Sequence, residues 1–329
     1  ANNEDHVEYD DLDDLTARHR RARKERVDSV SDTILEARRL HLRRIRDFEV
    51  DPETVEQLRK LGLGRRKQPL DNRAFTKKWL NNKQVATGMG AGGFAVHLGS
   101  ASKDWPMFKH NLPEVALAGH TNCGKSTLVN ALAGIHPRQG LAGVSERAGW
   151  TDFVSFYQIG KKPPVLTLVD LPGYGHAVAN RSMQREWRRM TKDYLSGQRR
   201  QLCRCCVLVD ATRGLAEEDR ILLAHLERRG IEHQLVLTKG DLLLPEQLAQ
   251  SMAAVTQDLM DIGAKLLAKP PILPVCGHTG AGVTALWENM RTRSLREPGS
   301  LVSSIEAARR VREAKLEKDR LKLQHTRTR

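Results

Sequence analysis

Short apolar runs and amphipathic stretches alternate along residues 94–295. The apolar runs are expected to form strands, the first at 115–118 and the others at 153–159, 165–170, 206–209, 235–237 and 272–275. The amphipathic stretches predict helices over 125–133, 184–194, 217–229, 246–259 and 283–290. An almost wholly apolar run such as 165–170 is typical of a strand inside a parallel sheet. The pattern therefore predicts a three-layer α/β domain with a mostly parallel sheet, whose ligand lies at the carboxyl ends of the strands.

The hydrophobic pattern before residue 94 is sparser. Over residues 32–48, one helical face gathers the less polar side chains, which are Ile34, Ala37, His41, Ile45 and Phe48. Asp51 followed by Pro52 is typical of a helix start, and we expect that helix to run to about Leu61 and to end at Gly62 or Gly64. Because the segment has few large apolar residues for its length, we expect it to lie on a partner and not to build its own core.

The formal net charge of +14 is unevenly distributed. Residues 1–14 contain acidic side chains and no Lys or Arg, whereas Lys and Arg outnumber Asp and Glu two to one in 15–93 and in 296–329. We therefore divide the chain into an N-terminal extension (1–93) with an acidic start and a basic helical or extended arm, a central domain (94–295), and a basic helical tail (296–329). Basic arms favour a polyanionic binding partner, RNA above all. The alternative is a pair of solvated helices whose charge only keeps them soluble.

The sequence argues against a membrane span, a disulfide framework, a zinc site and a dinucleotide-binding loop. No apolar run approaches the length of about 18 residues that marks a membrane span, so we expect no membrane span. The five cysteines, three of them within 202–206, form no disulfide pattern, which favours a reducing compartment. That cluster lacks a second ligand pair at workable spacing, so core thiols are favoured over zinc. Residues 88–93 match G-x-G-x-x-G in form, but no strand precedes them, and a hinge explains them better.

The first predicted strand leads into a phosphate-binding loop. Residues 119–126 read G-H-T-N-C-G-K-S, which is the P-loop spacing, between an apolar run and a helical pattern. Glycines in such a loop let backbone N–H groups cradle phosphate oxygens at the positive end of the following helix. Lys125 would reach the β- and γ-phosphates, and the Ser126 hydroxyl would ligate Mg²⁺. The alternative is a plain glycine turn between strand and helix. The expected nucleotide-binding residues here are Gly119, Asn122, Cys123, Gly124, Lys125, Ser126 and Thr127.

Two further predicted strands end in polar residues suited to the same ligand. Asp170 opens D-L-P-G, where it can hold a Mg²⁺-bound water, and the Gly173 N–H can contact a γ-phosphate and sense its loss. The T-K-G-D sequence contributes Thr238, Lys239 and Asp241 after another strand. A carboxylate at Asp241 can accept from both N1–H and the exocyclic amine of guanine. Adenine has no N1 proton, so this residue favours GTP over ATP.

These motifs, in this order, resemble a known family. G-H-T-N-C-G-K-S, G-W-T-D (149–152), D-L-P-G-Y-G (170–175) and T-K-G-D (238–241) look like a translation-factor-class small GTPase. D-A-T-R-G (210–214) and G-V-T-A-L-W (282–287) narrow the resemblance to the EngB (YihA) type, which assists assembly of the large ribosomal subunit. The resemblance covers about residues 94–295. It implies a P-loop GTPase domain, GTP or GDP with Mg²⁺, and as partners a large-subunit precursor, its rRNA, and ribosomal or assembly proteins.

Two motifs depart from the family pattern. The usual G-R-T-Q reads Gly149-Trp150-Thr151-Asp152, which keeps a threonine that would ligate Mg²⁺ in the triphosphate state; a plain loop threonine is the alternative. The guanine-cradling S-S-x-K aligns with residues 276–279, C-G-H-T. Backbone N–H groups at Cys276 and Gly277 could still meet guanine O6, but the lysine is missing, which puts tight nucleotide binding in question.

The resemblance also bears on hydrolysis. Lys125, Thr151 and Gly173 are the expected catalytic residues. Tyr174 takes the place where Ras-type enzymes have a water-orienting glutamine, so no general base is named and slow intrinsic hydrolysis is expected. Asn122 sits where related GTPases coordinate K⁺ near the phosphates; the alternative is that it only caps the loop.

The sequence therefore predicts a GTPase that assists large-subunit assembly and contacts rRNA through its arms. The first residue is Ala1 and not Met, so we expect that the chain was trimmed or has lost a leader. A family relative with such arms is expected to work in the mitochondrial matrix, or otherwise in the cytoplasm. The rival hypothesis is a hydrolysis-deficient structural factor that uses the domain as a nucleotide-stabilised wedge on rRNA. A P-loop nucleotide kinase is disfavoured, because such enzymes do not need T-K-x-D.

Overall fold

The structure is a computed structural model that describes residues 32–64, 95–108, 111–133, 153–160, 164–174, 181–196, 198–264 and 267–294. Several of the sequence-based predictions fall outside these ranges. They concern the acidic start, the basic block 18–26, the glycine-rich stretch 88–93, the G-W-T-D motif with Thr151, and the tail 296–329.

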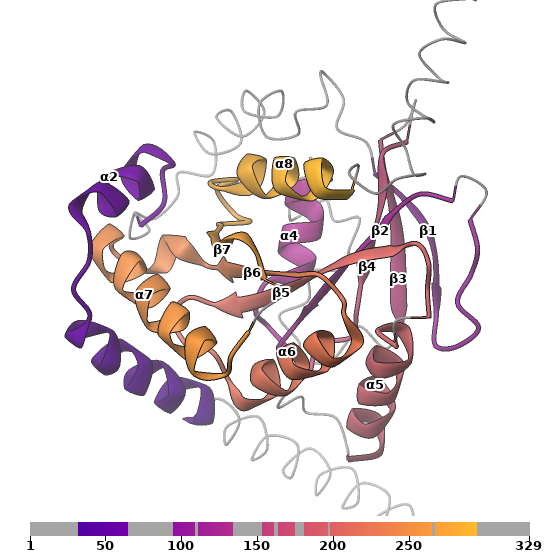
Figure 1. Cartoon of the computed structure of the whole chain (residues 1–329), viewed down its shortest axis with the longest axis horizontal. Helices are drawn as coiled ribbons and strands as arrows, with labels where there is room; N and C mark the ends of the chain where they lie inside the picture. Colours follow the sequence, from indigo (N-terminus) through magenta and orange to yellow (C-terminus); the bar gives the residue numbers. More distant parts are fainter. Residues whose placement is uncertain are drawn as a thin grey trace, which may run out of the picture.

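A seven-stranded sheet forms the centre of the domain (Figure 1). Its strands are β1 (Ala95–Ala101), β2 (Glu114–Gly119), β3 (Val154–Ile159), β4 (Leu166–Asp170), β5 (Leu202–Asp210), β6 (His233–Thr238) and β7 (Leu267–Pro274). Their spatial order is β1-β3-β4-β2-β5-β6-β7. The strands β4, β2, β5, β6 and β7 pair in parallel, whereas β3 pairs antiparallel with both β1 and β4. The predicted α/β class with a mostly parallel sheet is confirmed.

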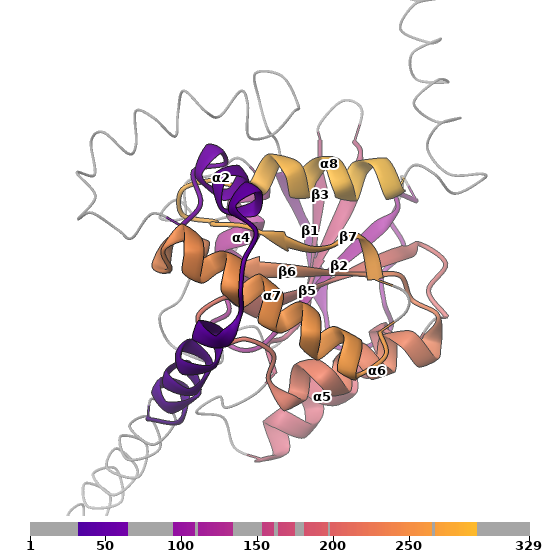
Figure 2. The same cartoon turned by 60° about the vertical axis from the view of Figure 1, so that its left-hand side comes forward.

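Helices cover both faces of the sheet, so the core has two halves (Figures 1 and 2). The helices that follow the strands are α4 (Lys125–Leu132), α5 (Arg181–Tyr194), α6 (Glu217–Arg229), α7 (Pro245–Asp261) and α8 (Val283–Ser294). Apolar side chains of α4 and α8 pack on one face with Val115, Leu117 and Leu208. Those of α6 and α7 pack on the other face with the intervening strand residues, as the pleat of a strand requires.

The edge strand β1 was not predicted. We expected the first strand at 115–118, but Ala95–Ala101 already pairs with β3 at the edge of the sheet. Its sequence, A-V-H-L-G-S-A, contains no continuous apolar run, and its residues are only partly buried or exposed. The register shifts between His97 and Gly99, which further hides the alternation that marks a strand.

The cysteine cluster lies inside β5, which starts earlier than predicted. Cys205 and Cys206 are buried, one toward each half of the core, and burial raises the pKa of both thiols. Arg204, which lies between Cys203 and Cys205 in the sequence, is also buried, and its guanidinium donates hydrogen bonds to Glu232 and to the Asn289 side chain, both at 2.5 Å. The prediction of core thiols is therefore confirmed for Cys205 and Cys206, whereas Cys203 is partly buried. In the described parts of the chain, no three His, Cys, Asp or Glu gather as metal ligands would.

The segment of residues 32–64, here called the N-terminal strap, packs against the domain. It contains a helix over 32–44, a 3₁₀ turn (Ile45–Asp47) and α2 (Pro52–Lys60). The predicted N-cap is confirmed, since Asp51 accepts from the backbone of Glu53 and Thr54. The strap runs along α7 in both views.

Residues 32–64 lie on the central domain of the same chain, which was not foreseen from the sequence, and they join the core of that domain. Ile45, Val55, Leu58 and Leu63 are buried, and the last three belong to the core cluster shared with the sheet and α7. Both α2 and the 3₁₀ turn contact α7. Arg44 adds a two-pronged contact to Asp258 of α7 at 2.8 and 3.0 Å. Across the described ranges, no helix combines the length and apolar character needed to cross a membrane.

This packing predicts a sharp contrast between two leucines, one within α2 and one at its C-terminal end. Leu58→Ala should lower the free energy of unfolding by about 2–5 kcal/mol, because it empties a buried position. Leu61→Ala, at a residue that is 48% exposed, should change it by less than about 0.5 kcal/mol. Denaturant unfolding of both variants and the wild type measures the difference. Equal, small effects would show that the strap does not share the core of the domain.

Candidate nucleotide-binding site

The predicted site residues gather at the carboxyl ends of the parallel strands. The P-loop follows β2, D-L-P-G follows β4, T-K-G-D follows β6, and the segment with Cys276 and Gly277 follows β7. Because these strands are parallel, their carboxyl ends share one edge of the sheet, where open α/β sheets bind ligands.

The P-loop turns tightly from β2 into α4. Asn122 and Gly124 have φ angles of 63° and 103°, in the left-handed region, and α4 begins at Lys125. The Lys125 ammonium is buried and donates to the Gly119 carbonyl at 3.0 Å and to the His120 carbonyl at 3.4 Å. Ser126 follows in the first turn of α4. The Lys125 ammonium is therefore held against the first residues of the P-loop. It lies at the N-terminal end of α4, and the N-terminal end of a helix favours bound anions.

The D-L-P-G segment lies against the P-loop. A Cβ atom on Gly173 would stand 2.8 Å from Lys125 Nζ and 3.1 Å from Thr121 Cα, so the close approach favours glycine. Backbone hydrogen bonds join the two segments further on, from Thr121 N to the Tyr174 carbonyl at 2.7 Å and from Tyr174 N to the Gly119 carbonyl at 3.3 Å. The structure thus brings Lys125 and Gly173 together, as the sequence predicted.

Asp170 is a buried acid that lacks a full set of partners. It is 2% exposed, and its Oδ1 atom has no hydrogen-bond partner among the described residues. Burial raises its pKa to about 6, although the nearby Lys125 ammonium lowers it in part. A buried carboxylate oxygen without a partner has a desolvation cost that a cation offsets. The donor set therefore fits Mg²⁺, which Asp170 through water and Ser126 would hold, and which neutralises phosphate charge when bound.

The T-K-G-D segment is tied to the P-loop and to the loop after β7. The Thr238 hydroxyl donates to the Cys123 carbonyl at 2.5 Å. The Cys276 thiol donates to Asp241 Oδ1 at 3.0 Å, and burial raises the pKa of this thiol to about 12, so it stays protonated. Gly277 lies directly against Thr127 of α4.

Asp241 keeps one oxygen available at this edge. It is 5% exposed, and its Oδ2 atom has no hydrogen-bond partner among the described residues. An unsatisfied buried carboxylate oxygen fits a ligand with N–H donors, as guanine has at N1 and its exocyclic amine. The predicted residues for the phosphate end and the base end thus line one edge of the sheet. Thr151, the predicted switch threonine, lies outside the described residues.

Comparison with known proteins places the chain in a family. Residues 114–239 match the family model described as 50S ribosome-binding GTPase. A probable GTP-binding protein EngB of Rhodospirillum rubrum is 36% identical over 179 residues, which cover 54% of this chain and 74% of that protein. The chain belongs to the EngB family of GTPases.

Two further matches have EngB in their names. An EngB of Rhodopseudomonas palustris (strain BisB18) is 39% identical over 173 residues, 53% of this chain and 76% of that protein. A crystal structure of a probable GTP-binding protein engB is 17% identical, covers 56% of this chain and 100% of its own, and has a TM-score of 0.42. The family assignment rests on the sequence relatives. GTPases of this family bind GTP or GDP with Mg²⁺, in agreement with the cofactors predicted here.

Two contacts of this EngB-family site were not predicted. Lys239 donates to Asp210 at the end of β5 at 2.7 Å, and the Tyr174 hydroxyl donates to Asp219 of α6 at 2.7 Å. Tyr174 is thereby anchored toward α6, and burial keeps its pKa well above 10. The D-A-T-R-G motif contains Asp210 and could have indicated it, because the motif follows a strand. Asp219 lies in the first turn of α6 and accepts from Ala216 N at 2.8 Å, so its position in the sequence indicates a helix start and gives no sign of the contact to Tyr174.

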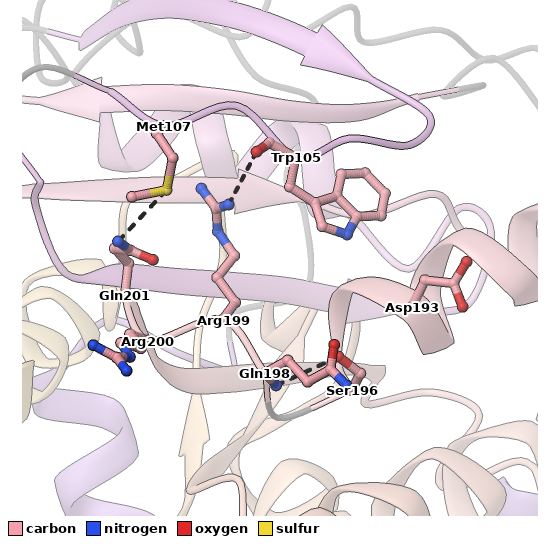
Figure 3. A pocket seen from close by; sticks show the side chains of 8 residues that line it. All are labelled: Trp105, Met107, Asp193, Ser196, Gln198, Arg199, Arg200 and Gln201. Carbon is pink, nitrogen blue, oxygen red and sulfur yellow. Dashed lines mark hydrogen bonds between the residues drawn. The ribbon is translucent and has the colours of Figure 1, made fainter.

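A separate cavity lies away from the EngB site. Its volume is about 630 Å³, and it lies at the opposite edge, near the amino ends of β2 and β5 (Figure 3). Its lining residues are Trp105, Met107, Asp193, Ser196, Gln198, Arg199, Arg200 and Gln201. Arg199 is already paired with Glu114, which also accepts from Tyr194 at 2.6 Å. The chemistry of the predicted residues, and not the size of this hollow, locates the nucleotide site.

The position of Lys125 yields a direct prediction. Lys125→Ala should abolish measurable GTP binding, because the β- and γ-phosphates lose the one cation that the P-loop supplies. Lys103→Ala, at an exposed lysine outside the nucleotide-binding motifs, should leave GTP binding at the wild-type level. Equilibrium binding of a fluorescent GTP analogue measures both. Wild-type affinity in Lys125→Ala would refute the assignment of residues 119–126 as the phosphate-binding loop.

Proposed function

We propose that this EngB-family chain is a GTP-dependent switch that assists maturation of the large ribosomal subunit. The observation that supports the proposal most is the pair of buried carboxylates, Asp170 and Asp241, each with an oxygen that lacks a partner among the described residues. They lie on either side of a P-loop in a chain that matches a 50S ribosome-binding GTPase model. The arrangement suits a guanine nucleotide with its metal.

Each proposed role follows from the chemistry of a residue. Lys125 would neutralise the β- and γ-phosphates, Asp170 and Ser126 would hold Mg²⁺, and Asp241 would accept the guanine N–H groups. Gly173 lies beside Lys125, so its N–H would respond when the γ-phosphate is lost. Thr151 would add a Mg²⁺ contact that exists only with the triphosphate.

The basic arms are proposed to bind rRNA and bordering ribosomal or assembly proteins. Lys and Arg exceed Asp and Glu in both arms, and phosphate contacts are the main source of affinity for nucleic acid. Function in the mitochondrial matrix is part of the same proposal.

The test of this function is sedimentation of the native protein from cell extract, followed by sequencing of the RNA crosslinked to it. Co-migration with a large-subunit-sized particle, with crosslinks to its rRNA, is the expected result. Migration as a free protein without rRNA would leave only the nucleotide-binding part of the proposal.

The second candidate is a factor that binds GTP without hydrolysing it. The observation that favours it is the hydrogen bond from the Cys276 thiol to Asp241 Oδ1. Cys276 begins the segment where the family pattern has a serine-rich loop with a lysine. Single-turnover hydrolysis on the assembly particle separates the two functions, since a structural wedge would show none.

The arm yields a prediction about salt. Gln in place of the basic residues of block 18–26 should weaken rRNA binding and flatten its salt dependence. The log–log slope should fall by about 0.7 for each phosphate of single-stranded RNA that the block no longer neutralises. A matched variant with Gln at the same number of basic positions in 296–329 reports whether the tail contributes separately. Binding isotherms at several salt concentrations give the slopes. An unchanged slope would contradict phosphate binding by the block.

The potassium hypothesis predicts an ion dependence. If Asn122 helps to coordinate K⁺ beside the phosphates, GTP hydrolysis on the particle should be faster in K⁺ than in Na⁺ at equal ionic strength, because the larger ion stands in for an arginine finger. Asn122→Ala should remove the difference. Equal rates in both salts for the wild type would refute the hypothesis and favour a simple loop-capping role for Asn122.

A further inference from the structure

The N-terminal strap ends on the loop that is proposed to read the base. Gly64 N donates to the Gly240 carbonyl at 3.1 Å, and Gly240 lies between Lys239 and Asp241. Leu63 is fully buried, and it and Leu248 are the side chains nearest to Gly240. A Cβ atom on Gly64 would stand 2.5 Å from the Pro245 backbone, so the chain needs glycine to approach this closely. The strap therefore touches the base-reading loop directly.

A second contact reaches the same loop through Asp210. One oxygen of this buried carboxylate accepts from Arg38 of the strap at 3.2 Å and from Lys239 at 2.7 Å. The other oxygen accepts from the Thr212 backbone and hydroxyl at 2.9 and 2.6 Å. Burial opposes the charge on Asp210, but the Lys239 ammonium, Thr212 and Arg38 together hold its pKa below the usual range. Arg38 thus shares with Lys239 a carboxylate that is ionised at neutral pH.

A third contact fixes the loop that contains Asp210. His41 of the strap lies at 3.0 Å from the Ser251 hydroxyl, which donates to the Ala211 carbonyl at 2.8 Å. The same imidazole lies directly against Gly214. Burial and the Arg44 charge lower the pKa of His41 to about 4, against the opposing charges of Asp258 and Asp210, so the ring is neutral near pH 7. The loop after β5 is therefore held between the strap and α7.

The base-reading loop has a conformation that needs such support. Lys239 has a φ angle of 58°, in the left-handed region that side chains with a Cβ seldom adopt. Strained residues of this kind persist only where their surroundings over-determine them. The strap supplies part of these surroundings through Leu63, Gly64 and, by way of Asp210, Arg38. The strap also precedes the matched family region, which begins at residue 114.

We propose that the N-terminal strap positions the guanine-recognition loop of this GTPase, with Leu63 and Arg38 as positioning residues. Leu63 and Gly64 fix Gly240, and Arg38 fixes Lys239 through Asp210, so Asp241 is presented to the base at the correct distance. Removal of either interaction weakens recognition of the guanine exocyclic amine more than it weakens binding of the rest of the nucleotide. The inference rests on the proposed role of Asp241 as the acceptor for guanine.

Inosine triphosphate separates these effects, because it keeps N1–H and the phosphates but lacks the exocyclic amine. The wild-type chain should prefer GTP over ITP by about tenfold or more, the equivalent of one hydrogen bond to a charged group. Leu63→Ala should reduce this ratio of affinities by at least about threefold, a change that lies within the interaction energies expected between residues in contact. The matched control is Leu58→Ala, which removes the same atoms from the same strap and core but not from beside Gly240.

A second pair of variants avoids the buried core. Arg38→Ala removes the contact to Asp210, whereas Arg39→Ala changes the neighbouring arginine, which is 70% exposed and pairs with Glu36 of its own helix at 3.7 Å. Arg38→Ala should lower the GTP-to-ITP ratio by at least about twofold, and Arg39→Ala should leave it unchanged. Arg38→Lys should restore part of the ratio. This pair decides the question if Leu63→Ala does not fold.

The outcomes separate the inference from the function on which it rests. A wild-type ratio near one would show that Asp241 does not read the amine, and both the base-reading role and the inference would then be rejected. A clear wild-type preference that persists in folded Leu63→Ala and in Arg38→Ala would overturn the inference alone. Equal loss of GTP and ITP affinity in Leu63→Ala and Leu58→Ala would also overturn it, because it would indicate general destabilisation.

Discussion

Parallel pairing of the central strands is the constraint on which this molecule depends. Hydrogen bonding of β2 to β4 and β5, and of β5 to β6, brings together loops that are far apart in sequence. The strands β2, β4 and β6 are buried on both faces, so a one-residue register error would exchange the side chains of the two core halves and disrupt the packing of both. The geometry of the nucleotide site is therefore fixed by the same packing that stabilises the domain.

The site places acidic groups in this packed region at a cost in desolvation. Asp170 has a raised pKa because burial removes water from its carboxylate, and Asp241 retains an oxygen without a partner in the described structure. Such groups are costly in a folded protein unless a ligand completes them. Mg²⁺ would offset the desolvation cost at Asp170, and the guanine N–H groups would offset the cost at Asp241. Binding of a guanine nucleotide with Mg²⁺ is therefore expected to stabilise the folded chain.

The sequence alone was sufficient to place three contiguous motifs in the fold. The P-loop, D-L-P-G and T-K-G-D could be placed on strand ends because each motif follows an apolar run. The edge strand β1 lacked such a run, and the strap has too few apolar residues for its packing to be foreseen. The bond between Arg38 and Asp210 joins residues 172 positions apart, and no local pattern signals a partnership of that kind. Long-range contacts were therefore the part that needed the structure.

The most direct test of the central claim is a competition titration with nucleoside diphosphates. The wild-type chain should bind GDP in preference to ADP and xanthosine diphosphate. Asp241→Asn should transfer the preference to xanthosine diphosphate, whose 2-carbonyl can accept from the new amide. Equal binding of GDP and ADP by the wild type, or an Asp241→Asn variant that still prefers GDP, would contradict the claim that this edge of the sheet reads guanine.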